Sequence, residues 1–419
     1  MIQALQRFIA SGLVLAVLLS AAPPSVRAAT STDEEELTAQ LSAVRTYFAR
    51  WFAPEEVTPL SVADLRSIID AGVTWTLNAI DEDGHFAYEY APYEGAYVFG
   101  DNIVRQAGTL YVLGEVYRRQ ETKSTKLETS LERVIEHFTD LSKAGEASGT
   151  EFRCLVASAS AVSCKLGASS LALLGLLGYL EVHGGDAPEE YAALAKDYLA
   201  YILASQKDSG GFRDEYRVGE GFRESESPYS NGEALLALVR YYQYDPVPEI
   251  KTAIDKAFTY LKDKPFESPL YLWIMAALKD MQQLWPNAAY VTYAKEFTDW
   301  RTFYASGFDR YKNYCAYNEG LTSAYGVLED EIDSGYLQTL RHEINTWNYR
   351  NQQLQLGAAH EYRLVVGDTG TQFQRITEPS LAYGGFLTSE HTLTQRIDFT
   401  QHCLSSYLQT LLDIEDAEI

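Results

Sequence analysis

The chain has 419 residues, of which 13% are aromatic, and its formal net charge at pH 7 is −24. So acidic a composition excludes a nucleic-acid partner, because binding to phosphates needs a basic face. The length exceeds that of a usual single domain, but it suits one closed ring of helices.

The N-terminal segment has the order of a secretory signal. Arg7 precedes an apolar run over residues 8–22, and Val26-Arg27-Ala28 follows with small or apolar residues where a signal peptidase reads. The run is shorter than the roughly 20 residues that span a bilayer, and no later stretch is expected to cross one. We therefore expect a signal peptide over residues 1–28 and a periplasmic or secreted chain over 29–419. Cleavage removes two arginines and no acid, which changes the net charge from −24 to −26.

Four cysteines form an even set, and disulfides persist in exported proteins. Cys154 and Cys164 bracket a segment of small, alternating residues. This pattern predicts a hairpin closed by a disulfide between the two.

Helical periodicity defines two alternating kinds of segment. The first kind is amphipathic with a charged face, and the second is nearly apolar all round and must be buried on most sides. Six of each predict an all-α fold, an (α/α)6 toroid of six helical hairpins in one domain. Two separate helical domains would need a polar or Pro/Gly-rich linker, which the chain lacks. The amphipathic segments are about 61–79, 125–142, 188–205, 249–262, 289–304 and 335–352, and the apolar ones about 101–118, 166–181, 230–243, 269–283, 318–330 and 397–412.

A Gly-Phe turn recurs three times, each time leading into a helix start. The turns are Asp83-Gly84-His85-Phe86, Ser209-Gly210-Gly211-Phe212 and Tyr383-Gly384-Gly385-Phe386. The longest irregular segments, around 80–100, 145–165, 207–228 and 363–396, all run from an outer helix to the next inner helix. We expect these long loops on one face, where they build a site.

These hairpins, the Gly-Gly-Phe turns and the helix start Ser230-Asn231-Gly232-Glu233-Ala234-Leu235-Leu236-Ala237-Leu238 resemble the six-hairpin toroid superfamily. That group includes many glycoside hydrolases, N-acylglucosamine 2-epimerases and uronyl C5-epimerases, and terpenoid cyclases share its fold in outline. The resemblance covers essentially the whole mature chain and is architectural. The aspartate-rich cation signature of terpene cyclases is missing, so a prenyl substrate ranks low.

The first turns of the inner helices are expected to converge at one end of the ring. Glu233 and Glu319 lie one to three residues inside such helices among Gly, Ala and Leu, where an unpaired buried carboxylate is costly. They should be paired or face a polar cavity. Two carboxylates across a cleft hydrolyse glycosidic bonds. Our hypothesis is that Glu233 and Glu319 are catalytic, with Asp398 as the substitute for either, although helix capping accounts for Asp101 and Asp398 equally well.

Other residues at this end are predicted to bind the substrate. Tyrosines offer flat apolar area with a polar tip, which suits a pyranose, and in a uronyl epimerase or lyase a tyrosine would be the acid or base. Arginines suit an anionic sugar, although an internal ion pair with Asp101 or Asp398 is the commoner outcome. His402 suits a general base or a structural hydrogen bond. The predicted binding residues are Asp101, Asn102, Arg105, Tyr229, Tyr271, Trp273, Tyr317, Asn318, Arg396 and His402.

Cys315, His402 and Cys403 together suggest zinc, as in lanthionine-synthetase-like toroids. Those proteins carry Trp-Cys-Tyr-Gly and Cys-His-Gly signatures, whereas the local sequences here are Asn313-Tyr314-Cys315-Ala316-Tyr317 and Gln401-His402-Cys403-Leu404. A Cys315–Cys403 disulfide between adjacent inner helices is the simpler account, so no metal or cofactor is expected.

The first interpretation is therefore an exported carbohydrate-active enzyme, a glycoside hydrolase or sugar epimerase, that acts on a neutral or anionic glycan by acid/base chemistry. The second is a non-catalytic glycan- or protein-binding toroid of a cell-envelope or polysaccharide system. The third is a lanthionine-type zinc enzyme.

Overall fold

A computed structural model describes residues 36, 38–41, 43–44, 57–305, 311–367 and 370–417 of the chain. The predicted signal peptide, residues 1–28, lies outside the described residues.

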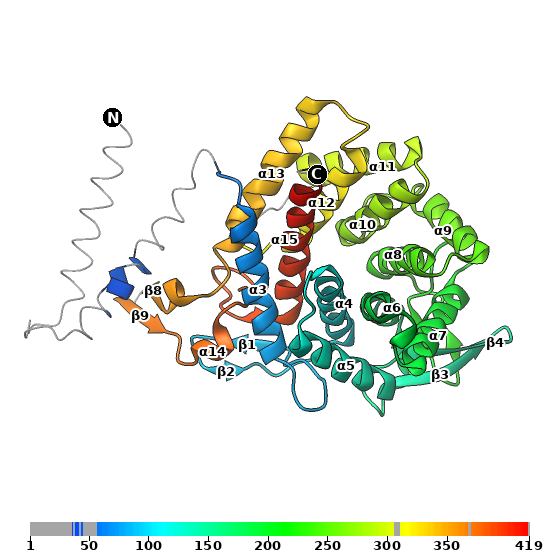
Figure 1. The fold of residues 1–419 in the computed structure, drawn as a ribbon, viewed down its shortest axis with the longest axis horizontal. Helices are drawn as coiled ribbons and strands as arrows, with labels where there is room; N and C mark the ends of the chain where they lie inside the picture. The colour runs from blue at the N-terminus through cyan, green and yellow to red at the C-terminus, as the bar shows by residue number, and fades with distance from the viewer. Residues whose placement is uncertain are drawn as a thin grey trace, which may run out of the picture.

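The predicted (α/α)6 toroid is confirmed. Six inner helices pack side by side, each against the next, and the last packs against the first, so the ring is closed (Figure 1). The inner helices are α4 (Ile103–Arg119), α6 (Leu166–His183), α8 (Pro228–Tyr244), α10 (Ser268–Leu284), α12 (Cys315–Leu328) and α15 (Ile397–Ala417).

Six outer helices wrap this ring, and each precedes its inner partner in the chain. Their apolar faces turn inward: in α5, for example, Leu127, Leu131, Val134, Ile135 and Phe138 are buried. This is the burial expected of an amphipathic helix that covers a core. The outer helices are α3 (Val62–Asn78), α5 (Thr125–Asp140), α7 (Glu189–Ser205), α9 (Pro248–Leu261), α11 (Ala288–Asp299) and α13 (Ser334–Gln352), and α11 continues into a π-helical turn over Trp300–Tyr304.

Helix α6 is buried along most of its length, and glycines let it approach α4 closely. A Cβ at Gly114 would lie 2.7 Å from the carbonyl oxygen of Gly175, and one at Gly178 would lie 2.7 Å from the carbonyl carbon of Gly114. The expectation that no later segment could span a membrane was wrong on composition, because α6 is long and apolar enough. However, 83% of its apolar window is buried inside the protein, as in the core helix of a toroid.

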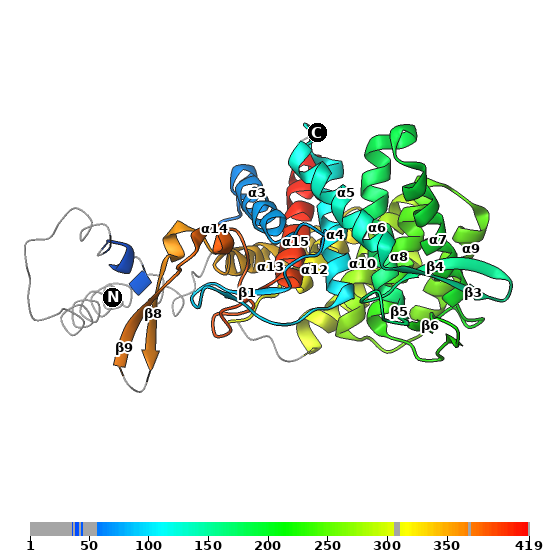
Figure 2. The ribbon, with the colours of Figure 1, turned by 90° about the horizontal axis from the view of Figure 1, so that it is seen from below.

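Short strands fill the long connections between outer and inner helices. Figure 2 shows β1, β5 and β6 at one end of the inner helices and the C-terminus at the other. Two three-stranded sheets have the orders β10-β1-β2 and β5-β6-β7, and two hairpins are β3-β4 and β8-β9. The strands are β1 (Glu89–Ala91), β2 (Ala96–Tyr97), β3 (Ser142–Ala147), β4 (Thr150–Leu155), β5 (Ser163–Lys165), β6 (Glu215–Arg217), β7 (Gly221–Phe222), β8 (Tyr362–Gly367), β9 (Gly370–Arg375) and β10 (Gln395–Arg396).

The Cys154–Cys164 disulfide is present, but the hairpin expected between the two cysteines is not. Cys154 belongs to β4, which pairs with β3, and Cys164 belongs to β5, which pairs with β6. Besides the disulfide, an isolated antiparallel bridge connects Val156, the residue after β4, to Cys164. The disulfide therefore ties two neighbouring sheets together.

The three Gly-Phe turns share one backbone geometry. Gly84, Gly210 and Gly384 have φ angles of +86°, +106° and +99°, which favour glycine. A Cβ at any of them would lie 2.1 to 2.4 Å from a carbonyl oxygen of the next outer helix. Because the third turn packs against α3, it joins the last hairpin to the first. The three carbonyl oxygens belong to Arg133 in α5, Lys256 in α9 and Ala71 in α3.

Each turn is also anchored to the inner helix that follows it. The backbone N–H groups of Phe86, Phe212 and Phe386 donate to a side-chain oxygen at the fourth residue of α4, α8 and α15. These anchor residues are Gln106, Asn231 and Thr400, at donor–acceptor distances of 3.0, 2.9 and 3.1 Å. The turn thereby fixes the height of the inner helix relative to the outer ring.

Replacing Gly210 with Ala tests this role of the turn. The substitution should lower the free energy of unfolding by about 2 to 4 kcal/mol, because it adds left-handed backbone strain and a clash with Lys256. Gly219→Ala is the matched control, since Gly219 has φ +80° but no atom within 4 Å of its Cβ position. Denaturant unfolding should show a smaller loss for the control, about 1 kcal/mol. Equal losses would mean that turn packing contributes nothing beyond strain.

Candidate functional site

The anchor residues give α4, α8 and α15 a common register. Two residues after each anchor lie Gly108, Glu233 and His402. In the ring α8 and α15 are opposite, because two inner helices separate them on either side. Glu233 and His402 therefore occupy equivalent positions on opposite inner helices, near the end of the ring at which the inner helices begin. We call that end, around Ile103, Pro228 and Ile397, the mouth.

Glu233 is a buried carboxyl group without a counter-charge. Its side chain is 2% exposed, and within the described part of the chain its Oε2 has no hydrogen-bond partner. Glycine at position 167 provides the room, since a Cβ there would lie 2.1 Å from Oε2. Burial raises the pKa of Glu233 to about 8, and no neighbouring charge contributes to the shift. At neutral pH the group is therefore mostly a protonated acid.

Glu319 is equally buried but fully engaged. Its Oε1 accepts a hydrogen bond from Ser405 Oγ at 2.6 Å, and its Oε2 lies 2.9 Å from Nδ1 of His402. The indole of Trp273 lies beside the imidazole, with ring centroids 5.9 Å apart. The arrangement is a carboxylate–imidazole pair, in which a carboxylate orients a histidine. The expected cavity-facing pair of Glu233 and Glu319 is thus divided into a lone acid and a paired one.

Asp398 lies between two arginines. Arg396 binds it through Nε and an Nη at 2.6 and 2.9 Å, and Arg105 Nε lies 2.9 Å from its Oδ2. Arg105 also contacts the hydroxyl of Tyr88. This is the internal ion pair that the sequence left open as the commoner outcome. It occupies part of the hydrogen-bonding capacity that an anionic sugar would need.

Asp101 and Asn102 organise the start of α4. Asn102 is the N-cap, and its side chain accepts from the backbone of Val104 and Arg105. Asp101 accepts from Gln106 Nε2 at 2.9 Å and lies 3.4 Å from Nε2 of His85. Burial opposes ionisation of Asp101, but the bonds from His85 and Gln106 outweigh it and lower the pKa of the carboxyl group. Asn102 therefore caps α4, and Asp101 holds the side chains of Gln106 and His85 next to it.

Three predicted binding residues point toward the outer helices. The hydroxyl of Tyr271 lies 3.1 Å from Thr298, and that of Tyr317 lies 2.9 Å from Thr302. The amide of Asn318 donates to Asn348 and Ser406. Helix α12 begins at Cys315, three residues earlier than expected, so Asn318 is inside the helix and not its cap. These three side chains pack between the two rings.

Of the remaining predicted binding residues, Tyr229 and Trp273 differ in exposure. Tyr229 lies at the start of α8 and is 52% exposed, whereas Trp273 is buried beside His402. Sequence reasoning missed Ser405, which holds Glu319. A serine inside an apolar helix gives no signal of that role until the neighbouring helix is known.

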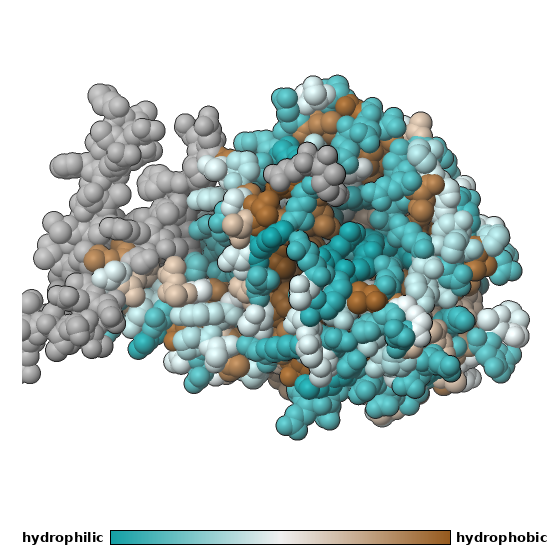
Figure 3. Space-filling view, in the orientation of Figure 1, coloured by the Kyte–Doolittle hydropathy of each residue, from teal (hydrophilic) through white to brown (hydrophobic). Residues whose placement is uncertain are grey.

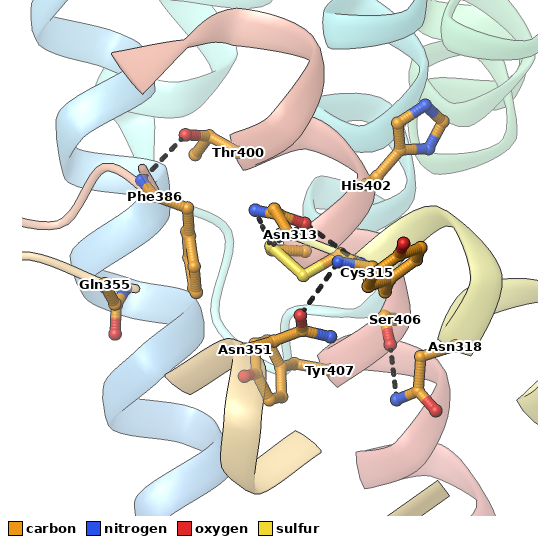
Figure 4. Close-up of a disulfide and its surroundings, with 12 residues drawn as sticks. Asn313, Cys315, Asn318, Asn351, Gln355, Phe386, Thr400, His402, Ser406 and Tyr407 are labelled. Atoms are coloured by element: carbon orange, nitrogen blue, oxygen red, sulfur yellow. Dashed lines mark hydrogen bonds between the residues drawn. A yellow bond between two sulfur atoms is a disulfide. The ribbon is translucent and has the colours of Figure 1, made fainter. Parts of the chain in front are cut away.

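A disulfide fixes the helices that carry Glu319 and His402 (Figure 4). Cys315 at the start of α12 is bonded to Cys403 of α15, and Asn313 donates to Cys403 Sγ at 3.3 Å. The expected Cys315–Cys403 pairing is therefore present. Because both thiols are oxidised, the zinc interpretation loses its two sulfur ligands.

Comparison with known proteins finds similarity in structure but not in sequence. No family model matches the sequence, and no curated protein sequence matches it. A GH76 α-mannanase of Bacteroides thetaiotaomicron superposes with a TM-score of 0.57 at 11% identity, over 85% of this chain and 98% of that one. A D-mannose isomerase superposes with a TM-score of 0.58 at 12% identity, over 84% and 98%. The cellobiose 2-epimerase of Spirochaeta thermophila gives 0.55 at 14% identity, over 84% and 97%.

These neighbours share its fold. They are (α/α)6 toroid enzymes, and the similarity covers nearly all of each neighbour's chain. At identities of this size, the likeness establishes the architecture and leaves the chemistry to be argued from the site.

Removing the Cys315–Cys403 disulfide should be more destabilising than removing Cys154–Cys164. The sequence separations are 88 and 10 residues, so loop-closure entropy predicts losses of about 4 to 5 and about 3 kcal/mol in the free energy of unfolding. Paired Cys→Ser variants and denaturant unfolding measure the two losses. If loss of Cys154–Cys164 lowers the free energy of unfolding more than loss of Cys315–Cys403, loop-closure entropy does not determine how much these disulfides stabilise the protein.

Proposed function

We propose that the protein is a carbohydrate-active enzyme that moves protons between a sugar and two groups at the mouth. Glu233 is the acid, and His402, oriented by Glu319, is the base. The observation that carries the proposal is the placement of a protonated carboxyl group and a carboxylate-bound imidazole at equivalent positions on opposite inner helices. The toroid enzymes that share the fold include sugar isomerases, epimerases and glycosidases, which supports a sugar as the substrate.

The division of labour follows from the surroundings of each group. An acid whose pKa is about 8 still carries its proton at neutral pH and is well placed to donate it. Glu319 is bonded at both oxygens, so it supports His402 and is not free to attack a substrate. Asp398 is ion-paired with Arg105 and Arg396, so we consider it a weaker candidate for a catalytic residue than Glu233.

This equipment favours isomerisation or epimerisation of a reducing sugar over hydrolysis. Removal and return of a proton at the carbon beside a carbonyl needs one base and one acid. Glycoside hydrolysis generally needs two carboxyl groups that flank the scissile bond. At this mouth only Glu233 is an unengaged carboxyl group among Glu233, Glu319 and Asp398.

Hydrolysis is the second candidate, and one observation favours it. The raised pKa of Glu233 is also the property of a general acid that protonates a leaving glycosidic oxygen. In that case His402 would activate the water. The exposed Tyr229 at the start of α8 suits either reaction, because an aromatic ring packs against a pyranose face.

We further propose that the protein is exported to the periplasm or the medium. Two disulfides support this location, since they persist in oxidising compartments. The signal-like N-terminal sequence supports it independently.

A panel of neutral and acidic mono- and oligosaccharides in heavy water tests the proposed reaction. An epimerase or isomerase should incorporate deuterium beside the carbonyl carbon of a reducing sugar, whereas a hydrolase should release new reducing ends without incorporation. Saturable binding without any product would instead support the non-catalytic glycan-binding toroid and would contradict the proposed chemistry.

Glu233→Gln should reduce kcat by about 100-fold or more while leaving the fold intact, because an amide cannot donate the proton. In the wild type, kcat should also fall above about pH 8, where Glu233 loses that proton. Rates of the two proteins on the best substrate of the panel, measured across pH, check both expectations. An active Gln variant would remove Glu233 from the mechanism.

The same substitution changes how stability depends on pH. Burial raises the pKa of Glu233 from 4.5 to about 8, so between these values the folded protein keeps a proton that the unfolded chain has lost. The contribution of Glu233 to the free energy of unfolding is highest below pH 4.5. It declines by about 1.4 kcal/mol per pH unit as the pH rises toward 8. Relative to the wild type, Glu233→Gln should gain stability over this window in denaturant unfolding. Parallel pH profiles would contradict the buried, protonated state.

A further inference from the structure

The hydrogen bonds that hold Glu319 continue into a row of three more side chains. Ser405 Oγ donates to Glu319 Oε1 at 2.6 Å, and Gln409 Nε2 donates to Ser405 Oγ at 3.3 Å. Ser323 Oγ donates to Gln409 Oε1 at 2.7 Å. Ser323 lies one turn after Glu319 on α12, and Gln409 lies one turn after Ser405 on α15. We call Ser323, Gln409 and Ser405 the α12–α15 row.

The chemistry of these groups sets the direction of the row. The carbonyl oxygen of Gln409 is occupied by the Ser323 hydroxyl, so its amide nitrogen is the atom that faces Ser405. The Ser405 oxygen accepts that bond, and its one proton goes to Glu319. The row therefore ends with a hydroxyl that donates to Oε1 of Glu319 and leaves Oε2 to face His402.

We propose that Ser323, Gln409 and Ser405 are positioning residues that set the tautomer of His402. With Oε1 of Glu319 occupied by Ser405, Oε2 accepts from Nδ1 of His402 at 2.9 Å. The proton then resides on Nδ1, and Nε2 remains as the free basic nitrogen. The amide nitrogen of Gln401 is farther from Nδ1, at 3.4 Å, and has no bond to offer a protonated Nδ1. The consequence for turnover rests on the proposed function, whereas the tautomer itself does not.

A polar cavity lies behind the row. The cavity has a volume of about 100 Å³ and is lined by all three residues of the row together with Tyr111. It shares Arg119, Arg240 and Asp280 with a hollow of about 440 Å³ at the far end of the ring. Figure 3 shows hydrophilic residues gathered in the middle of that face, over α4, α8, α10 and α15. A polar cavity of this size accommodates water, which would solvate the row from the side away from the mouth.

This placement distinguishes the two buried glutamates. Both carboxyl oxygens of Glu319 have a polar partner, Ser405 Oγ at 2.6 Å and Nδ1 of His402 at 2.9 Å. In the described part of the chain, Oε2 of Glu233 lies against Gly167 and has no hydrogen-bond partner. The α12–α15 row is therefore what allows one of the two carboxyl groups to serve as the partner of a base.

Nitrogen-15 NMR of the full chain with labelled histidine tests the proposal directly. The chain has seven histidines, and the His402 signal is identified by its loss in His402→Asn. At a pH where the ring is neutral, the wild type should show the proton on Nδ1. Ser405→Ala and Gln409→Met should each produce a mixture in which the Nε2–H tautomer is populated, because the carboxylate is then free to turn or to take up a proton.

Ser406→Ala is the matched control. Ser406 is the next residue of α15 and is equally buried, but it accepts a bond from Asn318 and has no bond to Glu319. This variant should keep the Nδ1–H tautomer even if it loses stability. An unchanged tautomer in both Ser405→Ala and Gln409→Met, or an equal change in Ser406→Ala, would overturn the proposal.

Kinetics provide the second measurement. On a substrate that the wild type turns over, Ser405→Ala and Gln409→Met should lower kcat about tenfold with little change in KM, since the bound sugar does not touch the row. Unchanged kcat in variants whose tautomer has shifted would show that Nε2 of His402 is not the base. If the wild type turns over no sugar, the proposed function fails, while the NMR result still decides the positioning role.

Discussion

The structure depends on the way each Gly-Phe turn joins an outer helix to the next hairpin. Glycine in the left-handed region brings the turn against a carbonyl group of the following outer helix, and the phenylalanine N–H bonds to the fourth residue of an inner helix. The turn thereby fixes both the spacing of the ring and the height of the helix within it. Since Gly384 packs against α3, the same contact closes the ring. This register gives Glu233 and His402 equivalent positions on opposite inner helices.

Three acidic residues near the mouth meet the cost of burial in different ways. Asp398 forms ion pairs with Arg105 and Arg396, and Glu319 is hydrogen-bonded to Ser405 and His402. For Glu233, no hydrogen-bond partner of Oε2 is found among the described residues, and burial raises its pKa to about 8. These differences matter because an uncompensated buried charge costs several kcal/mol. A site that combines a neutral acid with a held carboxylate can both donate and accept a proton at the same pH.

Much of the fold could be predicted from the sequence, because helical periodicity and apolar composition report burial directly. The alternating helices, the ring and both disulfides are confirmed. Composition alone could not classify α6, since a mostly buried core helix and a membrane-spanning helix have similar compositions. The start of α12 at Cys315 was missed because the sequence has no capping signal there. The N-cap residue of α12, Tyr314, makes no side-chain capping bond.

The site was harder to predict than the fold. First-turn position selected Glu233, Glu319 and His402 as candidates, and their role stays a prediction. The same criterion could not separate Tyr271 and Tyr317, which pack against the outer helices, from residues at the mouth. The equivalent positions of Glu233 and His402 could not be recognised in the sequence. The phenylalanine of the turn and its anchor residue are 19 residues apart for α8 but 14 residues apart for α15. Pairings across helices, such as Ser405 with Glu319, arise only when the ring is assembled.

The central claim is that Glu233 is a protonated acid at neutral pH and faces the substrate. An infrared difference spectrum between the wild type and Glu233→Gln at pH 7 tests it most directly. The account predicts the carbonyl stretch of a protonated carboxylic acid, which disappears on titration near pH 8 and shifts when a sugar substrate is added. A spectrum that shows an ionised carboxylate at pH 7, or a carbonyl band that is indifferent to every sugar, would contradict the account.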